Sequence, residues 1–166
     1  MATKEKGGAG YPFRYHPVIT GICKSKIKFK KIIISERNKK TAKTLKRKFK
    51  KINISKNNQE IIDKCDWIFL SVTPTVGEKI IKDLKFKSSH TIISFISTIT
   101  LSQLKKSIKV KANIVRAIPL PPISLKKGPV PICPPNPKVK KFFNWAPKIS
   151  INIGLKKTIR HYNEIL

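Results

Sequence analysis

Four short segments of the sequence could hold a ligand, because each follows an apolar run that is typical of a buried strand. In chain order they are Ser35–Asn38, Ser71–Pro74, Phe95–Ser97 and Ala117–Pro119. Three of these segments carry hydroxyl groups, and one carries an arginine. In open α/β sheets, ligands bind beyond the carboxyl ends of the strands, where the strand order reverses. The four segments therefore predict a binding site along one edge of a parallel sheet.

The first segment favours a phosphorylated nucleotide. Ser35, Arg37, Asn38 and Lys39 offer several hydrogen-bond donors to a dianion, as the extra phosphate of NADP requires. Glu36 argues the other way, since a lone acid at this position suits the ribose diol of NAD. We predict NADP(H) as the cofactor, with NAD(H) less favoured. The alternative is that Arg37 and Lys39 only solvate the start of a helix.

The other chemically active side chains form no recognisable catalytic or metal site. His16, His90 and His161 are isolated from acids and cysteines at catalytic or metal-binding spacing. Asp63 and Asp66 flank a predicted turn and are better explained as capping or solvated groups. No nucleophile elbow, lysine-containing phosphate loop or H-E-x-x-H motif is present. We therefore assign no catalytic residue and no metal site; hydride transfer requires neither, because the cofactor brings the chemistry.

The elements that would position these segments alternate along the chain. Short apolar runs rich in β-branched residues predict strands, and apolar residues at helical spacing predict amphipathic helices between them. This order implies parallel pairing with right-handed crossovers. We predict an α/β fold with a Rossmann-like, doubly wound parallel sheet. The expected strands are Ile32–Ile34, Ile52–Ile54, Trp67–Val72, Thr91–Ile96 and Asn113–Ile118.

Three helix starts carry a capping-box pattern, a polar cap followed three residues later by Glu or Gln. The predicted pairs are Asn57 with Glu60, Thr75 with Glu78, and Thr100 with Gln103.

Composition divides the chain into three parts. Glycines and prolines make residues 1–17 irregular, and residues 18–137 form the predicted nucleotide-binding domain. Eight of the twelve prolines lie between 119 and 137, a density that excludes a regular helix or central strand and leaves Val130–Cys133 as the strand candidate. Residues 138–166 form a tail with a possible strand at Ile149–Ile153 and a possible helix at Leu155–Ile165.

The net charge of +29 suggests nucleic acid as a partner, but its make-up argues against a specific binder. Only five of the 37 basic residues are arginines, whereas dedicated binders add arginine and stacking aromatic residues. We favour compositional drift and expect no specific nucleic-acid partner, although low-salt adhesion to polyanions is expected. Three cysteines without metal-like spacing and the lack of a long apolar run predict a reduced, cytoplasmic protein without a membrane partner.

An ordered series of motifs resembles one known family. The stretches IIISERNKKTAKTL, KNNQEIIDKCDWIFLSVTP, TIISFISTIT and NIVRAIPLPP are similar to the N-terminal domain of pyrroline-5-carboxylate reductase, over about residues 18–137. That family makes proline by NAD(P)H-dependent reduction of a cyclic imine. The resemblance implies that Ser35–Asn38 hold the adenosine phosphate. It also implies that the nicotinamide end is lined by Val72, Thr73 and Pro74, by Ser97, and by the R-A-x-P turn at Arg116–Pro119, which includes Ala117 and Pro119.

The sequence also departs from the family pattern. The family's first strand and G-x-G-x-x-G turn should precede Val18, but here Gly8-Ala9-Gly10 is followed by YPFRYHP. We therefore expect that first strand and glycine turn to be degraded or missing. Thr73 stands where the family has lysine, and Leu120 where it has asparagine. The family's second, helical domain, which dimerises and supplies much of the imine site, is expected to be absent, so a homodimer would need such a domain to be supplied.

Three other hypotheses stay open. The chain could be a different NADP-dependent reductase or dehydrogenase on the same fold. It could also be a basic nucleic-acid-associated protein that uses the fold as a scaffold, or an inactive fragment.

Overall fold

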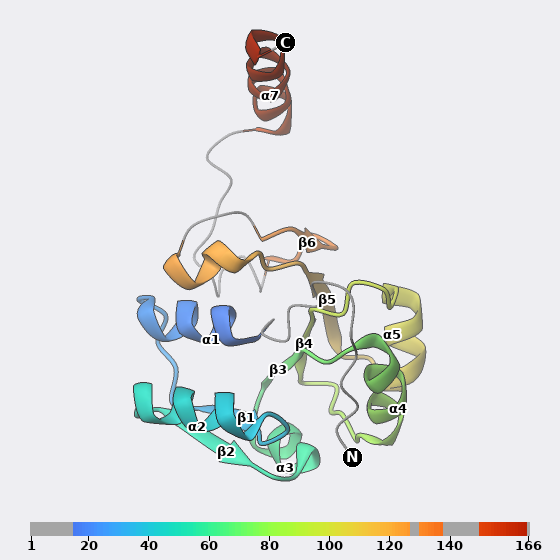
Figure 1. The fold of residues 1–166 in the computed structure, drawn as a ribbon. Coiled ribbons are helices and arrows are strands. Elements are labelled where there is room, and N and C mark those ends of the chain that lie inside the picture. The colour runs from blue at the N-terminus through green and yellow to red at the C-terminus, as the bar shows by residue number, and fades with distance from the viewer. Residues whose placement is uncertain (1–14, 127–129, 138–149, 166) are drawn as a thin grey trace. The chain divides into compact units, whose positions relative to one another are not determined.

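A computed structural model describes residues 15–126, 130–137 and 150–165 of the chain. It divides into two compact units, Met1–Pro135 and Asn136–Leu166, each of which is described by itself. The first unit alternates helices and strands, as predicted (Figure 1). In chain order its elements are α1 (Tyr15–Lys24), β1 (Ile32–Ser35), α2 (Lys39–Lys48), β2 (Ile52–Ser55), α3 (Asn58–Lys64), β3 (Trp67–Leu70), α4 (Pro74–Asp83), β4 (Thr91–Ser94), α5 (Leu101–Ile108), β5 (Asn113–Ala117), the 3-10 helix η1 (Pro121–Leu125) and β6 (Ile132–Cys133).

The strands pair as a doubly wound fold requires. β1 pairs with β2, β3 with β4, and β4 with β5, all in parallel, and the short β6 adds to β5 in the antiparallel sense. β4 is the most enclosed of the strands, with all four of its residues buried. The predicted Rossmann-like α/β fold is confirmed.

The described strands form two hydrogen-bonded sheets instead of one, in the orders β1-β2 and β3-β4-β5-β6. In the usual doubly wound order 3-2-1-4-5-6, the first strand of the motif lies between the second and the fourth. The break between β1 and β3 is therefore the place of the strand that the sequence was expected to lack. Gly8 and Gly10 of the expected turn lie outside the described residues.

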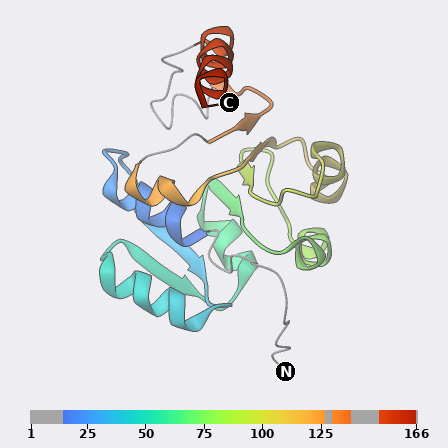
Figure 2. The same ribbon diagram turned by 45° about the horizontal axis from the view of Figure 1, so that its top comes forward.

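Two clusters of buried side chains hold the unit together. One joins β3, β4 and β5 to α4 and α5, and includes Leu70, Ile92 and Leu104. The other joins α1 and α2 to the two-stranded sheet through residues such as Leu45 and Ile52. Apolar burial on each side of the break therefore fixes the strands and the helices that cover them. Figure 2 shows these helices and strands as a ribbon.

Several predicted boundaries were wrong. α1 begins at Tyr15 within the stretch expected to be irregular, because proline is tolerated in the first turn of a helix and Pro17 lies there. α4 begins at Pro74 with Thr73 as its N-cap, so the predicted capping box at Thr75 and Glu78 does not start this helix. Proline at the first helical position fixes φ at a helical value and moves the start forward.

The proline-rich segment forms the 3-10 helix η1 and then β6, which pairs with β5 and covers Ile132–Cys133 of the strand candidate Val130–Cys133. In the second unit, α7 spans Ile151–Ile165. It replaces the strand expected at Ile149–Ile153 in its described part, because the apolar spacing of four between Leu155 and Ile159 continues a helix. Position 149 lies outside the described residues. Among the described helices, none has the length and apolarity to cross a membrane.

Candidate functional site

The carboxyl ends of β3, β4 and β5 lie level with one another. Leu70 is the register partner of Ser94, and Ser94 is in turn the partner of Arg116. Phe95 continues the pattern, since its N–H donates to the carbonyl oxygen of Leu70 at 2.9 Å. The segments that follow these strands therefore leave the sheet along one edge, as predicted. This edge collects the predicted site residues Val72, Thr73, Pro74, Ser97, Ala117 and Pro119.

Arg116 connects two of these segments. Its Nη2 donates a hydrogen bond of 2.6 Å to the carbonyl oxygen of Ser97. Its Nε is buried without a hydrogen-bond partner, and so is the Oγ of Ser71 at the end of β3. Buried polar groups normally have partners, and an unpaired one costs free energy. The two atoms are therefore groups that a bound ligand could satisfy.

The sequence placed Ser71 at the head of a strand-end segment and Arg116 in the R-A-x-P turn, but it marked neither as an individual cofactor-binding residue. Both lie in or beside the strand-end segments that the pattern marked. A serine that ends a buried apolar run, and an arginine inside one, were the available signals, because either side chain needs a polar partner when it is buried.

The start of α4 brings a helix N-terminus to the same edge. Thr73 provides no side-chain cap, so no side chain of the N-cap occupies the N–H groups of the first turn. Gly77 lets this turn approach the sheet, because a Cβ there would lie 2.8 Å from Cδ1 of Ile96 and 3.3 Å from Cγ2 of Val72. The Val72–Pro74 turn can therefore present backbone donors to a polar group.

The predicted phosphate segment lies at the end of β1, in the other sheet. Asn38 is the N-cap of α2, and its Oδ1 accepts the N–H of Thr41 at 3.0 Å. The Oγ of Ser35 accepts the N–H of Arg37 at 3.4 Å. The side chain of Arg37 is exposed, whereas Glu36 is half-buried. Asn38 is thus largely committed to capping, and Arg37 is the free cation of the segment.

Helix α1 begins next to the break in the sheet and is held by η1. A Cβ on Gly21 of α1 would lie only 2.6 Å from the carbonyl oxygen of Ile123, so only glycine permits this approach. Thr20, the residue before Gly21, is buried, and its Oγ1 has no hydrogen-bond partner. In dinucleotide-binding folds, the pyrophosphate binds at the N-terminus of the helix that follows the first strand. α1 is the helix in that position here.

The titratable groups with shifted pKa values lie elsewhere. Burial raises the pKa of the Cys23 and Cys65 thiols, which pack against the two apolar clusters. Burial also lowers the pKa of His90, which precedes β4 at the opposite end of that strand from the candidate site. The described part of the chain contains no group of three or more His, Cys, Asp or Glu residues able to hold a metal ion. No proton donor is therefore assigned at the site.

One family model matches part of the chain. Residues 17–98 match the family model described as NADP oxidoreductase, coenzyme F420-dependent. A search of curated proteins found no match.

Several solved structures are similar over most of the chain. They include pyrroline carboxylate reductase of Plasmodium falciparum with NADP bound (23% identity, TM-score 0.64, 78% of this chain and 48% of that one). Two further enzymes of this kind are similar to this chain. They are those of Streptococcus pyogenes (22% identity, TM-score 0.61, 77% of this chain and 48% of that one) and Coxiella burnetii (19% identity, TM-score 0.63, 78% of this chain and 50% of that one). The resemblance to pyrroline-5-carboxylate reductases is therefore confirmed in the fold, and the chain spans about half the length of these enzymes. The family's description and the Plasmodium structure both name NADP, the cofactor that the sequence predicts.

Proposed function

We propose that the first unit binds NADP(H) along the carboxyl edge of its strands. The observation that carries this proposal is the convergence of three strand ends, two buried unpaired polar atoms and the N-terminus of α4 on one edge. The family match over residues 17–98 supports it independently. Different sets of residues suit the two ends of the cofactor.

At the adenosine end, the exposed guanidinium of Arg37 would bind the 2′-phosphate, with the Ser35 hydroxyl beside it. Asn38 would contribute its remaining side-chain amide hydrogens, since its Oδ1 already caps α2. Lys39 at the start of α2 would add charge. A dianion gains more from this group than a ribose diol does, which is the basis for preferring NADP(H) to NAD(H).

At the nicotinamide end, Val72, Thr73 and Pro74 would position the ring, with Ser97, Ala117 and Pro119 beside them. The carboxamide of the ring is a polar group that could satisfy Ser71 Oγ or Arg116 Nε. When bound, the cofactor supplies a hydride. The chain's part is to bind and orient the ring and to exclude water from it.

We further propose that the protein is an oxidoreductase that reduces a small cyclic imine, as pyrroline-5-carboxylate reductases do in proline synthesis. Support comes from the fold shared with three such enzymes and from the motif series between residues 32 and 122. The imine site and any homodimer would depend on a second domain, because the chain spans about half of those enzymes. A soluble, cytoplasmic location belongs to the same proposal.

A second candidate is another NADP-dependent reductase on the same fold. Thr73 and Leu120 favour it, since both are exposed near the nicotinamide end and neither matches the residue type expected for the imine reductase. Thr73 and Leu120 would then contact a different substrate.

Titration calorimetry with NADPH and NADH tests the cofactor proposal, at moderate salt so that bulk charge is screened. Saturable binding that favours NADPH is the expected result. Failure of both nucleotides to bind would overturn it, and the likeness would then describe fold and ancestry alone. Turnover of 1-pyrroline-5-carboxylate by the protein tests the substrate, and binding without turnover would favour another reductase.

A further inference from the structure

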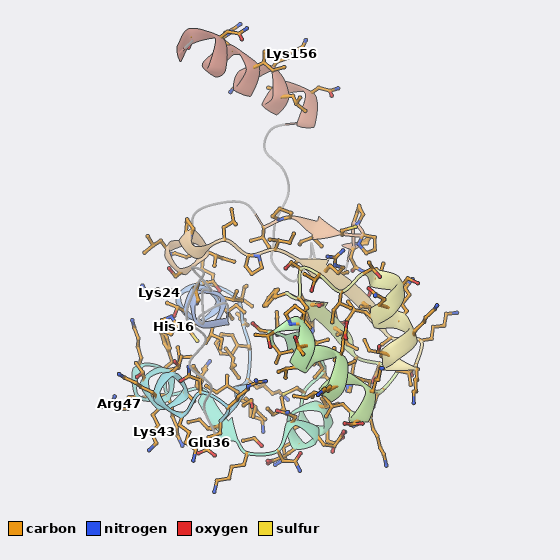
Figure 3. All side chains as sticks on the ribbon, turned by 45° about the vertical axis from the view of Figure 1, so that its right-hand side comes forward. His16, Lys24, Glu36, Lys43, Arg47 and Lys156 are labelled. Atoms are coloured by element: carbon orange, nitrogen blue, oxygen red, sulfur yellow. The ribbon has the colours of Figure 1, made fainter. Side chains whose placement is uncertain are left out.

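Basic residues are concentrated in one stretch of the first unit. Between Lys24 and Lys51, 14 of 28 residues are Lys or Arg, out of 37 in the whole chain, and Glu36 is the only acid. All fourteen are exposed. They come from α2 and from the segments on either side of it, and Figure 3 shows Lys24 and Arg47 along the same side of the domain. We call this surface the basic face.

The packing of α2 determines which of its residues lie on the basic face. Thr41, Ala42 and Leu45 are buried and fix one side of the helix against the core. The opposite side consists of five cations, which fall on one stripe at helical spacing: Lys39, Lys40, Lys43, Lys46 and Arg47. Nine positions rise about 12 Å. One strand of a nucleic-acid duplex presents about three or four phosphates over that length.

Little of the charge of the basic face is compensated within the described part of the chain, where Lys31 helps to lower the pKa of Glu60 without forming an ion pair with it. Among the described residues, none of its fourteen cations forms an ion pair; the pair that is present joins Lys64 to Glu60 on α3. Composition alone would scatter lysines over the surface, whereas here the packing of one helix collects uncompensated cations on one side. Such a surface attracts a polyanion over a distance set by ionic strength.

The aromatic residues of this surface are not available for stacking on bases. Phe29 and Phe49 are both half-buried. The Nζ of Lys51 lies 5.3 Å from the ring centroid of Phe29, and the Nζ of Lys48 lies 5.8 Å from that of Phe49. Single strands are bound largely through base stacking on free aromatic faces. The basic face therefore suits the phosphates of a duplex better than the bases of a single strand.

We propose that the basic face binds double-helical nucleic acid through its phosphates, without reading base sequence. The α2 stripe makes the central contacts, and the lysines before and after α2 extend them. Arg37 and Lys39 belong both to this face and to the proposed adenosine end, so the test uses residues in the last turn of α2, away from Ser35–Asn38.

The test uses anisotropy of a short fluorescein-labelled DNA duplex between about 50 and 200 mM salt. The variant is Lys46→Glu with Arg47→Glu in the last turn of α2. The matched control is Lys105→Glu with Lys106→Glu in the last turn of α5, where both lysines are equally exposed. Both variants change the net charge by the same amount, and Figures 1 and 2 place α5 away from α2. A second pair with glutamine in place of glutamate serves if charge reversal impairs folding.

Wild-type protein should bind saturably and equally to duplexes of unrelated sequence. The α2 variant should lose at least about tenfold in affinity and about two in the slope of log K against log salt, while the control loses less than about threefold. Equal losses in the two variants would overturn the proposal, because bulk charge would then explain binding. Equally tight binding of poly-glutamate, or no saturable binding at all, would overturn it as well.

Discussion

Gly21 of α1 and Ile123 of η1 touch through their backbones, so closely that a Cβ on Gly21 would lie 2.6 Å from the carbonyl oxygen of Ile123. This contact joins the helix beside the sheet break to the turn that follows β5. It thereby holds the second half of α1 against the turn that follows the Ala117–Pro119 segment.

Replacing Gly21 with alanine should therefore destabilise the first unit by about 1–3 kcal/mol, since the oxygen it meets belongs to the backbone and cannot rotate away. Gly77→Ala is the matched control, because its tightest neighbour is the end of the Ile96 side chain, which can shift. Urea unfolding should show the greater loss for Gly21→Ala. A loss no greater than that of Gly77→Ala would show that α1 and η1 are less close in solution.

The side chain of Arg37 should discriminate between the two nicotinamide cofactors. Arg37→Ala should weaken NADPH binding by about tenfold or more, the value of a charge-assisted contact to phosphate, and NADH binding by much less. Titration calorimetry measures both. Lys43→Ala, one helical turn beyond Lys39 on the same helix, controls for general loss of charge. Equal losses for NADPH and NADH would remove Arg37 from the phosphate site.

Of two predicted capping boxes that begin with threonine, the one at Thr100 forms and the one at Thr75 does not start its helix. Thr100 and Gln103 make the predicted capping box, with Thr100 Oγ1 accepting the Gln103 N–H at 3.2 Å and Gln103 Oε1 accepting the Thr100 N–H at 2.8 Å. Thr100→Ala should cost about 1 kcal/mol in unfolding free energy. Thr75→Ala should cost close to nothing, because α4 starts earlier at Pro74. A comparable loss at Thr75 would restore the predicted start.

These cases show what local sequence could and could not specify. The strands were predictable because buried β-branched runs have few alternatives, and the ends of those runs located the candidate edge. The start of α4 was not predictable from the capping pattern, because Pro74 sets the helical φ before Thr75 is reached. The contact of Gly21 with Ile123 joins residues about a hundred positions apart, and no local pattern reports such a contact. The unpaired atoms of Ser71 and Arg116 likewise emerge only once the strand ends are packed.

His90 should make the stability of the first unit depend on pH. It is buried, and its Nδ1 accepts the N–H of Lys87 at 3.1 Å, a bond that only the unprotonated nitrogen can accept. Burial and Lys87 hold the pKa of His90 below its ordinary value, outweighing Asp66 and Asp63, which raise it. The unfolded chain therefore takes up this proton first, at about pH 6.5. The contribution is fully present above that pH and is lost as the pH falls toward the folded-state pKa.

Urea unfolding between about pH 5 and 7.5 measures this effect. The unfolding free energy of the wild type should fall as the pH is lowered through this range, and that of His90→Gln should fall less steeply. Identical slopes for the two proteins would mean that His90 is protonated as readily in the folded state as in the unfolded chain.

The break between β1 and β3 should be visible in amide hydrogen exchange. The N–H groups of Ile32 and Glu36 donate to the carbonyl oxygens of Lys51 and Ser55 in and beside β2. Because the donors of a parallel strand alternate between its two edges, the N–H of Ile33 points to the edge away from β2, where the described residues provide no strand. Ile33 should therefore exchange at least about tenfold faster than Ile34. In β4, which pairs on both edges, Ile92 and Ile93 should both be protected. Equal protection of Ile33 and Ile34 would mean that a further strand pairs with β1 in solution and that the sheet is continuous.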